Sequence, residues 1–156
     1  MSILTLSAVV STIVYFQSKN TLIPSDILSK INFLIYYPND ENSWTTDASR
    51  TSFDSEAGVL SLYPIYSNNT IVLTQQSSPE VFKDVPEQYQ RLLDTLNQYS
   101  EITTSFGTVT LTKPDELNGG QSAVANLNGT LLFAKPNREL TNQEWQIFFK
   151  SIEVVR

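Results

Sequence analysis

The pattern of apolar and polar positions predicts an amphipathic helix in the middle of the chain. Tyr89, Leu92, Leu93 and Leu96 fall at i, i+3, i+4 and i+7, which places all four on one face of a helix. Asp84 lies where the N-cap residue of this helix is expected. The helix therefore has one apolar face to bury against another element.

A second amphipathic helix is predicted close to the C-terminus. Thr141 and Glu144 form the Thr-x-x-Glu sequence of a capping box, which marks a helix start. Four apolar residues then repeat at helical spacing and should lie on a sheet: Trp145, Phe148, Phe149 and Ile152.

Short apolar runs bounded by turn residues predict β-strands through the rest of the chain. Asn128-Gly129 is the strongest hairpin signal, since both residues favour the positive φ that a tight two-residue turn needs. Residues 39–49 read as a polar loop, and residues 25–31 as a short helix after Pro24. The predicted strands are residues 33–37, 51–55, 59–66, 70–75, 101–105, 107–112, 121–127 and 129–135.

These elements predict the α+β class. Short hairpin connections dominate, so we expect a mostly antiparallel β-sheet of about 6–8 strands. The two main helices should pack on its faces. Residues 21–156 then form a single α+β domain, which is the size expected for one domain.

The N-terminus carries an uncharged apolar segment. Residues 3–16 read ILTLSAVVSTIVYF, which is shorter than the ~20 apolar residues of a full membrane span. No basic residue precedes the segment and no small-x-small cleavage site follows it, as a signal peptide would require. A buried element of the domain, a signal peptide and a truncated membrane anchor are the three alternatives.

We favour the anchor, with residues 1–20 as hydrophobic segment and spacer. This interpretation places the protein at the cell membrane as a single-pass protein, with its domain outside the cytoplasm. Secretion is the alternative.

The composition excludes several kinds of chemistry. The chain has no His and no Cys, so it cannot hold a Ser–His–Asp triad, a catalytic Cys–His pair or a thiolate metal site. Its net charge is −6, with ten basic residues scattered among sixteen acidic ones, which argues against nucleic acid as a partner. The acidic pairs fall in predicted loops and turns, where they are expected for solubility. We therefore expect no enzyme activity, no cofactor and no metal site.

Five residues are candidates for ligand or partner contact. Trp44 lies in the polar loop, and Tyr63 and Tyr66 could line a groove with it, although core packing is the alternative for all three. Lys113 and Lys135 end two similar segments, GTVTLTKPDEL and GTLLFAKPNREL. If these segments are the outer strands of an antiparallel meander, both lysines lie at one end of the sheet, where they could meet an anionic group.

Four stretches of the chain carry a resemblance to a known group of proteins: IPSDILSKINFLIYYP, TIVLTQQSSPEVF, GTVTLTKPDELNGGQSAVANLNGTLLFAKP and TNQEWQIFFKSIEVV. They resemble small, uncharacterised membrane-anchored proteins of the bacterial envelope. More distantly, they are similar to extracytoplasmic domains of anti-sigma-type proteins. Residues 39–49 depart from that pattern, which has a Leu-Pro-x-Gly-Tyr turn there. The resemblance implies an outward-facing anchored domain and supplies no catalytic residues.

Two functional hypotheses follow. The first is a membrane-tethered extracytoplasmic binding or protein-interaction domain, whose partner is an unknown envelope protein. The second is a carrier that holds a lipid or another apolar ligand between sheet and helix. A large apolar cavity beneath the helix at residues 86–98 would favour the carrier. A filled core with an exposed aromatic patch would favour the interaction domain.

Overall fold

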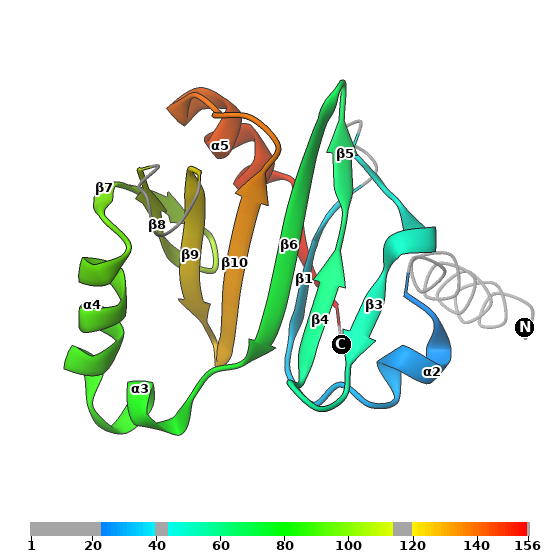
Figure 1. The fold of residues 1–156 in the computed structure, drawn as a ribbon, viewed down its shortest axis with the longest axis horizontal. Helices are drawn as coiled ribbons and strands as arrows, with labels where there is room; N and C mark the ends of the chain where they lie inside the picture. The colour runs from blue at the N-terminus through cyan, green and yellow to red at the C-terminus, as the bar shows by residue number, and fades with distance from the viewer. Residues whose placement is uncertain (1–22, 40–43, 114–119, 156) are drawn as a thin grey trace, which may run out of the picture.

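The computed structural model describes residues 23–39, 44–113 and 120–155 (Figure 1). Its main feature is an antiparallel sheet of nine strands, in the order β2-β5-β6-β10-β9-β8-β7, with β4 also beside β6 and β3 beside β4. The strands are β2 (Thr45–Thr46), β3 (Ser52–Asp54), β4 (Val59–Leu62), β5 (Pro64–Tyr66), β6 (Asn69–Ser77), β7 (Gln98–Thr104), β8 (Gly107–Thr112), β9 (Ser122–Leu127) and β10 (Thr130–Pro136).

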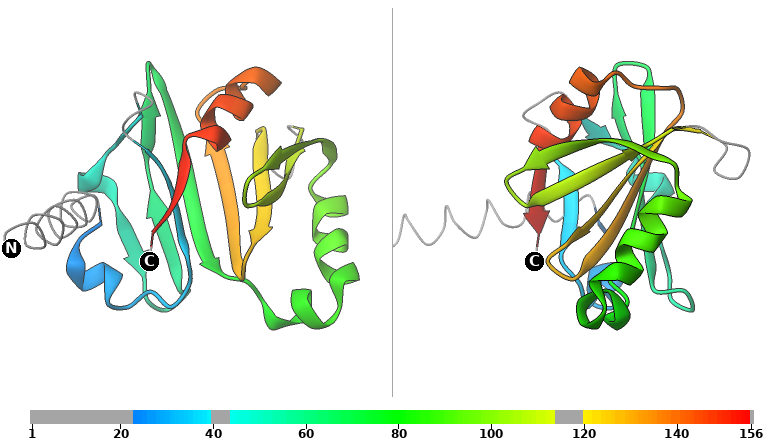
Figure 2. Two further views of the ribbon diagram at one scale, coloured as in Figure 1. Left: turned by 180° about the vertical axis from the view of Figure 1, so that it is seen from behind. Right: turned by 90° about the vertical axis from the view of Figure 1, so that its left-hand side faces the viewer.

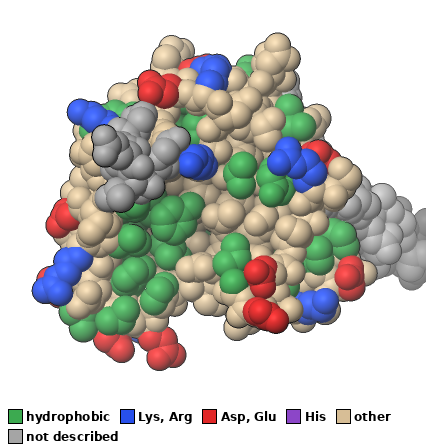
Figure 3. All heavy atoms as spheres, viewed as in Figure 1, with side chains coloured by type: hydrophobic (Ala, Val, Ile, Leu, Met, Phe, Trp, Pro, Cys, Tyr) green, Lys and Arg blue, Asp and Glu red, His purple; other side chains and the backbone are tan. Residues whose placement is uncertain are grey.

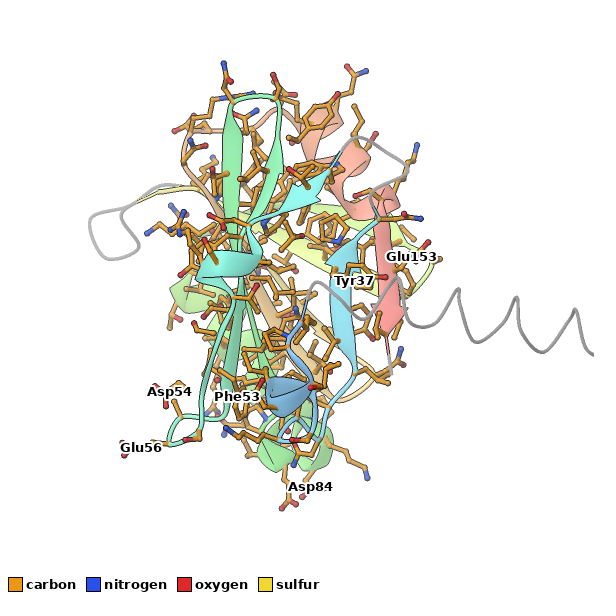
Figure 4. All side chains as sticks on the ribbon, turned by 90° about the vertical axis from the view of Figure 1, so that its right-hand side faces the viewer. Tyr37, Phe53, Asp54, Glu56, Asp84 and Glu153 are labelled. Atoms are coloured by element: carbon orange, nitrogen blue, oxygen red, sulfur yellow. The ribbon has the colours of Figure 1, made fainter. Side chains whose placement is uncertain are left out.

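Two further strands form a small sheet of their own. β1 (Ile35–Pro38) pairs antiparallel with β11 (Ile152–Val155), although more than a hundred residues separate them. Figure 4 shows the side chains of Tyr37 and Glu153, which are register partners in this pair. The same view shows Asp54 and Glu56 at the tip of the β3–β4 hairpin, pointing away from the body of the protein.

The described helices are short. They are α2 (Ser25–Leu28), the 3₁₀ helix η3 (Ala48–Arg50), α3 (Glu80–Asp84), α4 (Pro86–Thr95) and α5 (Asn142–Lys150). Figure 2 shows the β1–β11 pair and α5 on one face of the main sheet, which we call the inner face. α3 and α4 lie on the opposite, outer face. The domain therefore has three layers.

The main core lies on the inner face. Alternate residues of β4, β6, β8, β9 and β10 point into it, as expected for strands that bury one face. Trp145 and Phe148 of α5 and Tyr36 of β1 are fully buried there. The capping box of Thr141 and Glu144 starts α5 as predicted.

A smaller core lies under α4 on the outer face. Leu93 of α4 packs against Val124 of β9 and Leu131 of β10, and all three side chains are buried. Partly buried apolar side chains surround them: Phe82, Tyr89, Leu92, Leu96 and Phe133. The helix face predicted from the sequence is therefore the face that packs, and side chains fill the space beneath α4.

The α+β class and the antiparallel sheet are confirmed, and α4 and α5 are the two longest described helices. The predicted number of 6–8 strands is too low, since the main sheet alone has nine. The hairpin at Asn128-Gly129 is confirmed, with φ of 48° and 83° at its two turn residues.

Three local predictions are wrong. Asp84 is not the N-cap of α4, because it ends the separate helix α3 and Val85 occupies the cap position. Ile152 does not continue α5, because it begins β11. Residues 39–49 are not all loop: Thr45–Thr46 pairs with β5, and the Asp47 side chain caps η3 by accepting from Ser49 N–H.

The predicted N-terminal segment, residues 3–16, lies outside the described residues. Among the described helices, none is long and apolar enough to cross a membrane.

Candidate functional site

An open cleft of about 520 Å³ lies between β7 and α5. We call it the β7–α5 cleft. One wall is a run of consecutive residues at the end of β7 and its turn, and the other is one face of the C-terminal half of α5. The lining residues are Glu101, Ile102, Thr103, Thr104, Ser105, Gln146, Phe149 and Lys150.

The strand wall is an edge of the main sheet. Within the described residues, β7 pairs with β8 and with no other strand. Figure 2, in its right-hand view, shows β7 between β8 and α5. The β7–β8 turn is held by Thr104, whose hydroxyl accepts from the backbone N–H of Phe106 at 3.1 Å and donates to the carbonyl of Gly107 at 2.7 Å. The edge is therefore fixed in place beside the cleft.

The helix wall follows from the spacing of its residues. Gln146, Phe149 and Lys150 stand at i, i+3 and i+4, so they share one face of α5. Phe149 is buried against Trp145 and Phe148, whereas Gln146 and Lys150 are exposed. The cleft thus has an apolar floor, formed by Phe149 and the buried Ile102, and a polar rim.

The buried side chain of Gln121 connects the two walls. Its Oε1 accepts from the backbone N–H of Leu140 at 2.8 Å, and its Nε2 donates to the Leu140 carbonyl at 3.1 Å. The same Nε2 donates to the hydroxyl of Tyr99 at 2.8 Å. Because Tyr99 belongs to β7 and Leu140 lies just before α5, this one amide helps to set the spacing between strand and helix.

Successive side chains of β7 face opposite sides of the sheet. Ile102 faces the inner side and joins the main core, whereas Glu101 faces the outer side, near Tyr89 of α4. Burial, helped by the Glu101 carboxylate and opposed by a hydrogen bond with the Asn126 backbone, raises the pKa of Tyr89 to about 12. The rim of the cleft therefore carries a carboxylate on the strand and the Lys150 ammonium group on the helix.

The cleft has hydrogen-bonding and apolar groups but no catalytic constellation. Among the described residues, no group of three or more His, Cys, Asp and Glu side chains is placed to hold a metal ion. Hydroxyls of Thr103 and Ser105, the Gln146 amide and the outward backbone groups of β7 are the polar features available. Such an arrangement can bind, and it offers hydrogen bonds to another backbone.

The structure brings Trp44 and Tyr66 together, two of the residues predicted to make contacts. Their rings stack with centroids 5.0 Å apart, and Trp44 also packs edge-on against Phe148 at 4.9 Å. The Trp44 side chain is only 3% exposed, because it is part of the main core. Both rings border a shallow hollow of about 20 Å³ beside Ile147, which is too small for a ligand.

The other three predicted contact residues lie elsewhere. Tyr63 holds the guanidinium of Arg50 over its ring at 3.9 Å. The strand register places Lys113 and Lys135 at the same end of the sheet, each one residue beyond the last pairs of β8 and β10 with β9. Lys113 lies 5.7 Å from the ring centroid of Tyr99. The structure therefore does not gather the five residues into one site.

A second surface is the apolar area over α3 and α4. Figure 3 shows apolar side chains collected over these helices and the neighbouring strands on the outer face. Val81 and Val85 are 44% and 40% exposed, and Phe82, Leu92 and Phe133 are partly buried against the smaller core. This area lies over the packed side chains of Leu93, Val124 and Leu131.

Comparison with known proteins adds no relative. No family model, no curated protein and no solved structure is significantly similar to the chain.

Proposed function

We propose that this protein is a binding domain that holds a segment of a partner protein in the β7–α5 cleft. The observation that carries the proposal is the position of the cleft along the edge of β7 that pairs with no other described strand. Five consecutive residues, Glu101 to Ser105, line it. A small-molecule site is usually more enclosed and gathers polar groups from several elements. A cleft that follows a strand edge suits an extended protein segment instead.

Two further features favour an interaction domain over a carrier of an apolar ligand. The space beneath α4 is occupied by Leu93, Val124 and Leu131. The apolar surface lies outside this packing, over α3 and α4 (Figure 3). A carrier needs a cavity in which most of the ligand surface is buried, and a docking domain needs only a surface.

The proposal keeps the membrane tether as its second part. Residues 1–20 would hold the domain at the outer side of the cell membrane, and the partner would be another envelope protein. This part rests on the uncharged segment at residues 3–16. Expression of the full chain with a C-terminal epitope tests it: protease added to intact cells should remove the epitope, and alkaline carbonate should leave the protein in the membrane fraction.

Peptide selection tests the binding function. Random peptides displayed on phage are selected against the full chain in detergent micelles, and enriched sequences are then made synthetically for affinity measurements. Gln146→Trp should fill the cleft and weaken binding by at least about tenfold, equal to ~1.4 kcal/mol. Gln143→Trp is the matched control, since Gln143 is exposed on α5 and outside the cleft lining. It should leave the affinity within about twofold.

Two outcomes would contradict the proposal. In one, no peptide sequence is enriched by selection on the protein compared with selection on detergent micelles alone. The other is an enriched peptide that binds the wild type, Gln146→Trp and Gln143→Trp equally well, since such a peptide would bind outside the cleft.

A further inference from the structure

We infer that the partner segment binds as an added β-strand. It is hydrogen-bonded to the edge of β7 that lies away from β8, and it is covered by α5. This inference rests on the proposed function and specifies its ligand class. The ligand is an extended peptide in which apolar residues alternate with polar or basic ones. It is recognised through its backbone as well as through its side chains.

The edge of β7 provides the backbone partners. In an antiparallel pair, each strand directs the N–H and C=O groups of alternate residues toward its neighbour and the remaining groups away from it. The β7 groups that point toward β8 are paired with it along Ser100 to Thr104, where the register is regular. The remaining groups point away from β8, toward the side on which the cleft and α5 lie. An incoming strand would satisfy these groups, as in other cases of strand addition.

The other edges of the main sheet are poor templates. β2 has two residues and β3 has three, and each pairs with a single described strand. Very short edge strands are one way in which proteins prevent unwanted pairing. β7 has seven residues, and its irregularity is confined to the start, where the register shifts between Gln98 and Ser100. Its regular part is the part that borders the cleft.

The cleft has the length and depth for a short strand. The run from Glu101 to Ser105 spans about 14 Å at ~3.4 Å per residue. A volume of about 520 Å³ along this run leaves room for a peptide backbone and its inward side chains. The opposite wall is the face of α5 that presents Gln146 and Lys150. A ligand strand would therefore lie between a strand and a helix.

The two sides of β7 set the side-chain preference. Ligand side chains on the inner side would lie over the apolar floor formed by Ile102 and Phe149, which favours apolar residues there. Ligand side chains on the outer side would lie beside Glu101 and Thr103. The Glu101 carboxylate favours a basic or hydrogen-bonding residue at these positions. The result is an alternating ligand pattern.

Backbone N-methylation of an enriched peptide provides the test. Each amide of the peptide is methylated in turn, and the affinity of each analogue for the full chain is measured. Strand addition predicts a period of two: alternate analogues bind at least about tenfold more weakly, and those between stay within about twofold. Amide exchange followed by NMR should show that the outward-pointing amides of β7 become protected when the unmodified peptide binds.

The results separate this inference from the proposed function. If the peptide needs an open cleft, as judged by Gln146→Trp, but N-methylation shows no period of two, the binding function stands and strand addition is overturned. Unchanged exchange of the β7 amides would also overturn it. A dimer of the chain without peptide that Gln146→Trp dissociates would mean that a second copy occupies the edge, and would overturn the assignment to a partner peptide. If no peptide binds, both proposals fail.

Discussion

The side-chain amide of Gln75 satisfies both backbone groups of Tyr36. Tyr36 N–H donates to Gln75 Oε1 at 2.7 Å, and Gln75 Nε2 donates to the Tyr36 carbonyl at 2.8 Å. Both residues are buried, so the amide takes the place of a neighbouring strand and joins the β1–β11 pair to β6 of the main sheet. A glutamine side chain thereby connects two sheets that share no backbone pairing between described strands.

Gln75→Leu should destabilise the fold strongly. It keeps a similar volume but leaves a buried N–H and a buried C=O of Tyr36 without partners, each at a cost of about 1–3 kcal/mol. We expect the free energy of unfolding, measured by urea titration, to fall by about 3 kcal/mol. Gln76→Leu is the control, because Gln76 faces the outer side and is only partly buried. Its effect should stay below about 1 kcal/mol, and equal effects of the two substitutions would contradict the argument.

Gln121→Leu should change the cleft as well as the stability. The substitution removes the bonds to both Leu140 backbone groups and to the Tyr99 hydroxyl, which connect the two walls. We expect a stability loss of about 3 kcal/mol and a fall in peptide affinity, although Gln121 does not line the cleft. Binding is measured without urea, at a temperature at which the variant is fully folded. Gln121→Glu retains an acceptor for Leu140 N–H and should lose less than the leucine variant at low pH, where a protonated carboxyl can also donate.

Core variants far from the cleft test whether Gln121 positions the cleft walls. If their peptide affinity falls in proportion to their loss of stability, the effect of Gln121→Leu is a general effect of lowered stability. Ala125→Gly supplies that comparison, since Ala125 is buried in β9 and does not line the cleft. It should lower stability without changing the affinity of the folded protein for peptide.

Local patterns in the sequence were enough to predict much of this fold. The helical spacing of Leu93 and its neighbours, the capping box at Thr141 and the turn at Asn128-Gly129 each depend on nearby residues, and the structure has all three. β11 was missed for the opposite reason. Ile152 continues the helical spacing of Phe148 and Phe149, while the strand it pairs with is more than a hundred residues away.

The cleft could not be predicted in the same way. Gln75 and Gln121 look like surface residues of strands, and only the packing of distant segments makes them buried amides that satisfy a backbone. Glu101 to Ser105 was predicted as a strand, but its position at a sheet edge beside α5 follows from the topology. The polar sequence neighbours of Trp44 favour a contact residue, whereas its neighbours in space are the core rings of Tyr66 and Phe148.

Tyr89 should make the protein sensitive to alkali. Burial, with help from Glu101, raises the pKa of Tyr89 from 10.0 to about 12, so the folded state favours the neutral phenol. The stabilising contribution is complete below pH 10 and is lost as the pH rises through about 12. Tyr89→Phe should show a shallower loss of stability across this range, measured by urea titration at each pH. Glu101→Gln should lower the pKa of Tyr89 and retain most of the shift, since burial is its main cause. An equal alkaline loss in Tyr89→Phe and wild type would show that other groups account for it.

Glu144 should make the start of α5 sensitive to acid. The hydrogen bond from Arg138, followed by that from the Thr141 backbone N–H, lowers the pKa of Glu144 from 4.5 to about 2. A lowered pKa means that the stabilising contribution is present above pH 4.5 and is lost as the pH falls through about 2.

Glu144→Gln retains a capping side chain but removes the charge, so it should be less stable than wild type at pH 7. The difference, read from urea midpoints, should shrink as the pH falls from 4.5 toward 2 and should be smaller in high salt, because the pair is exposed. Arg138→Met removes the hydrogen bond that does most to lower the pKa of Glu144. The pH range over which stability is lost should therefore be narrower in this variant. A difference between Glu144→Gln and wild type that stays constant down to pH 2 would assign the effect to cap geometry instead of charge.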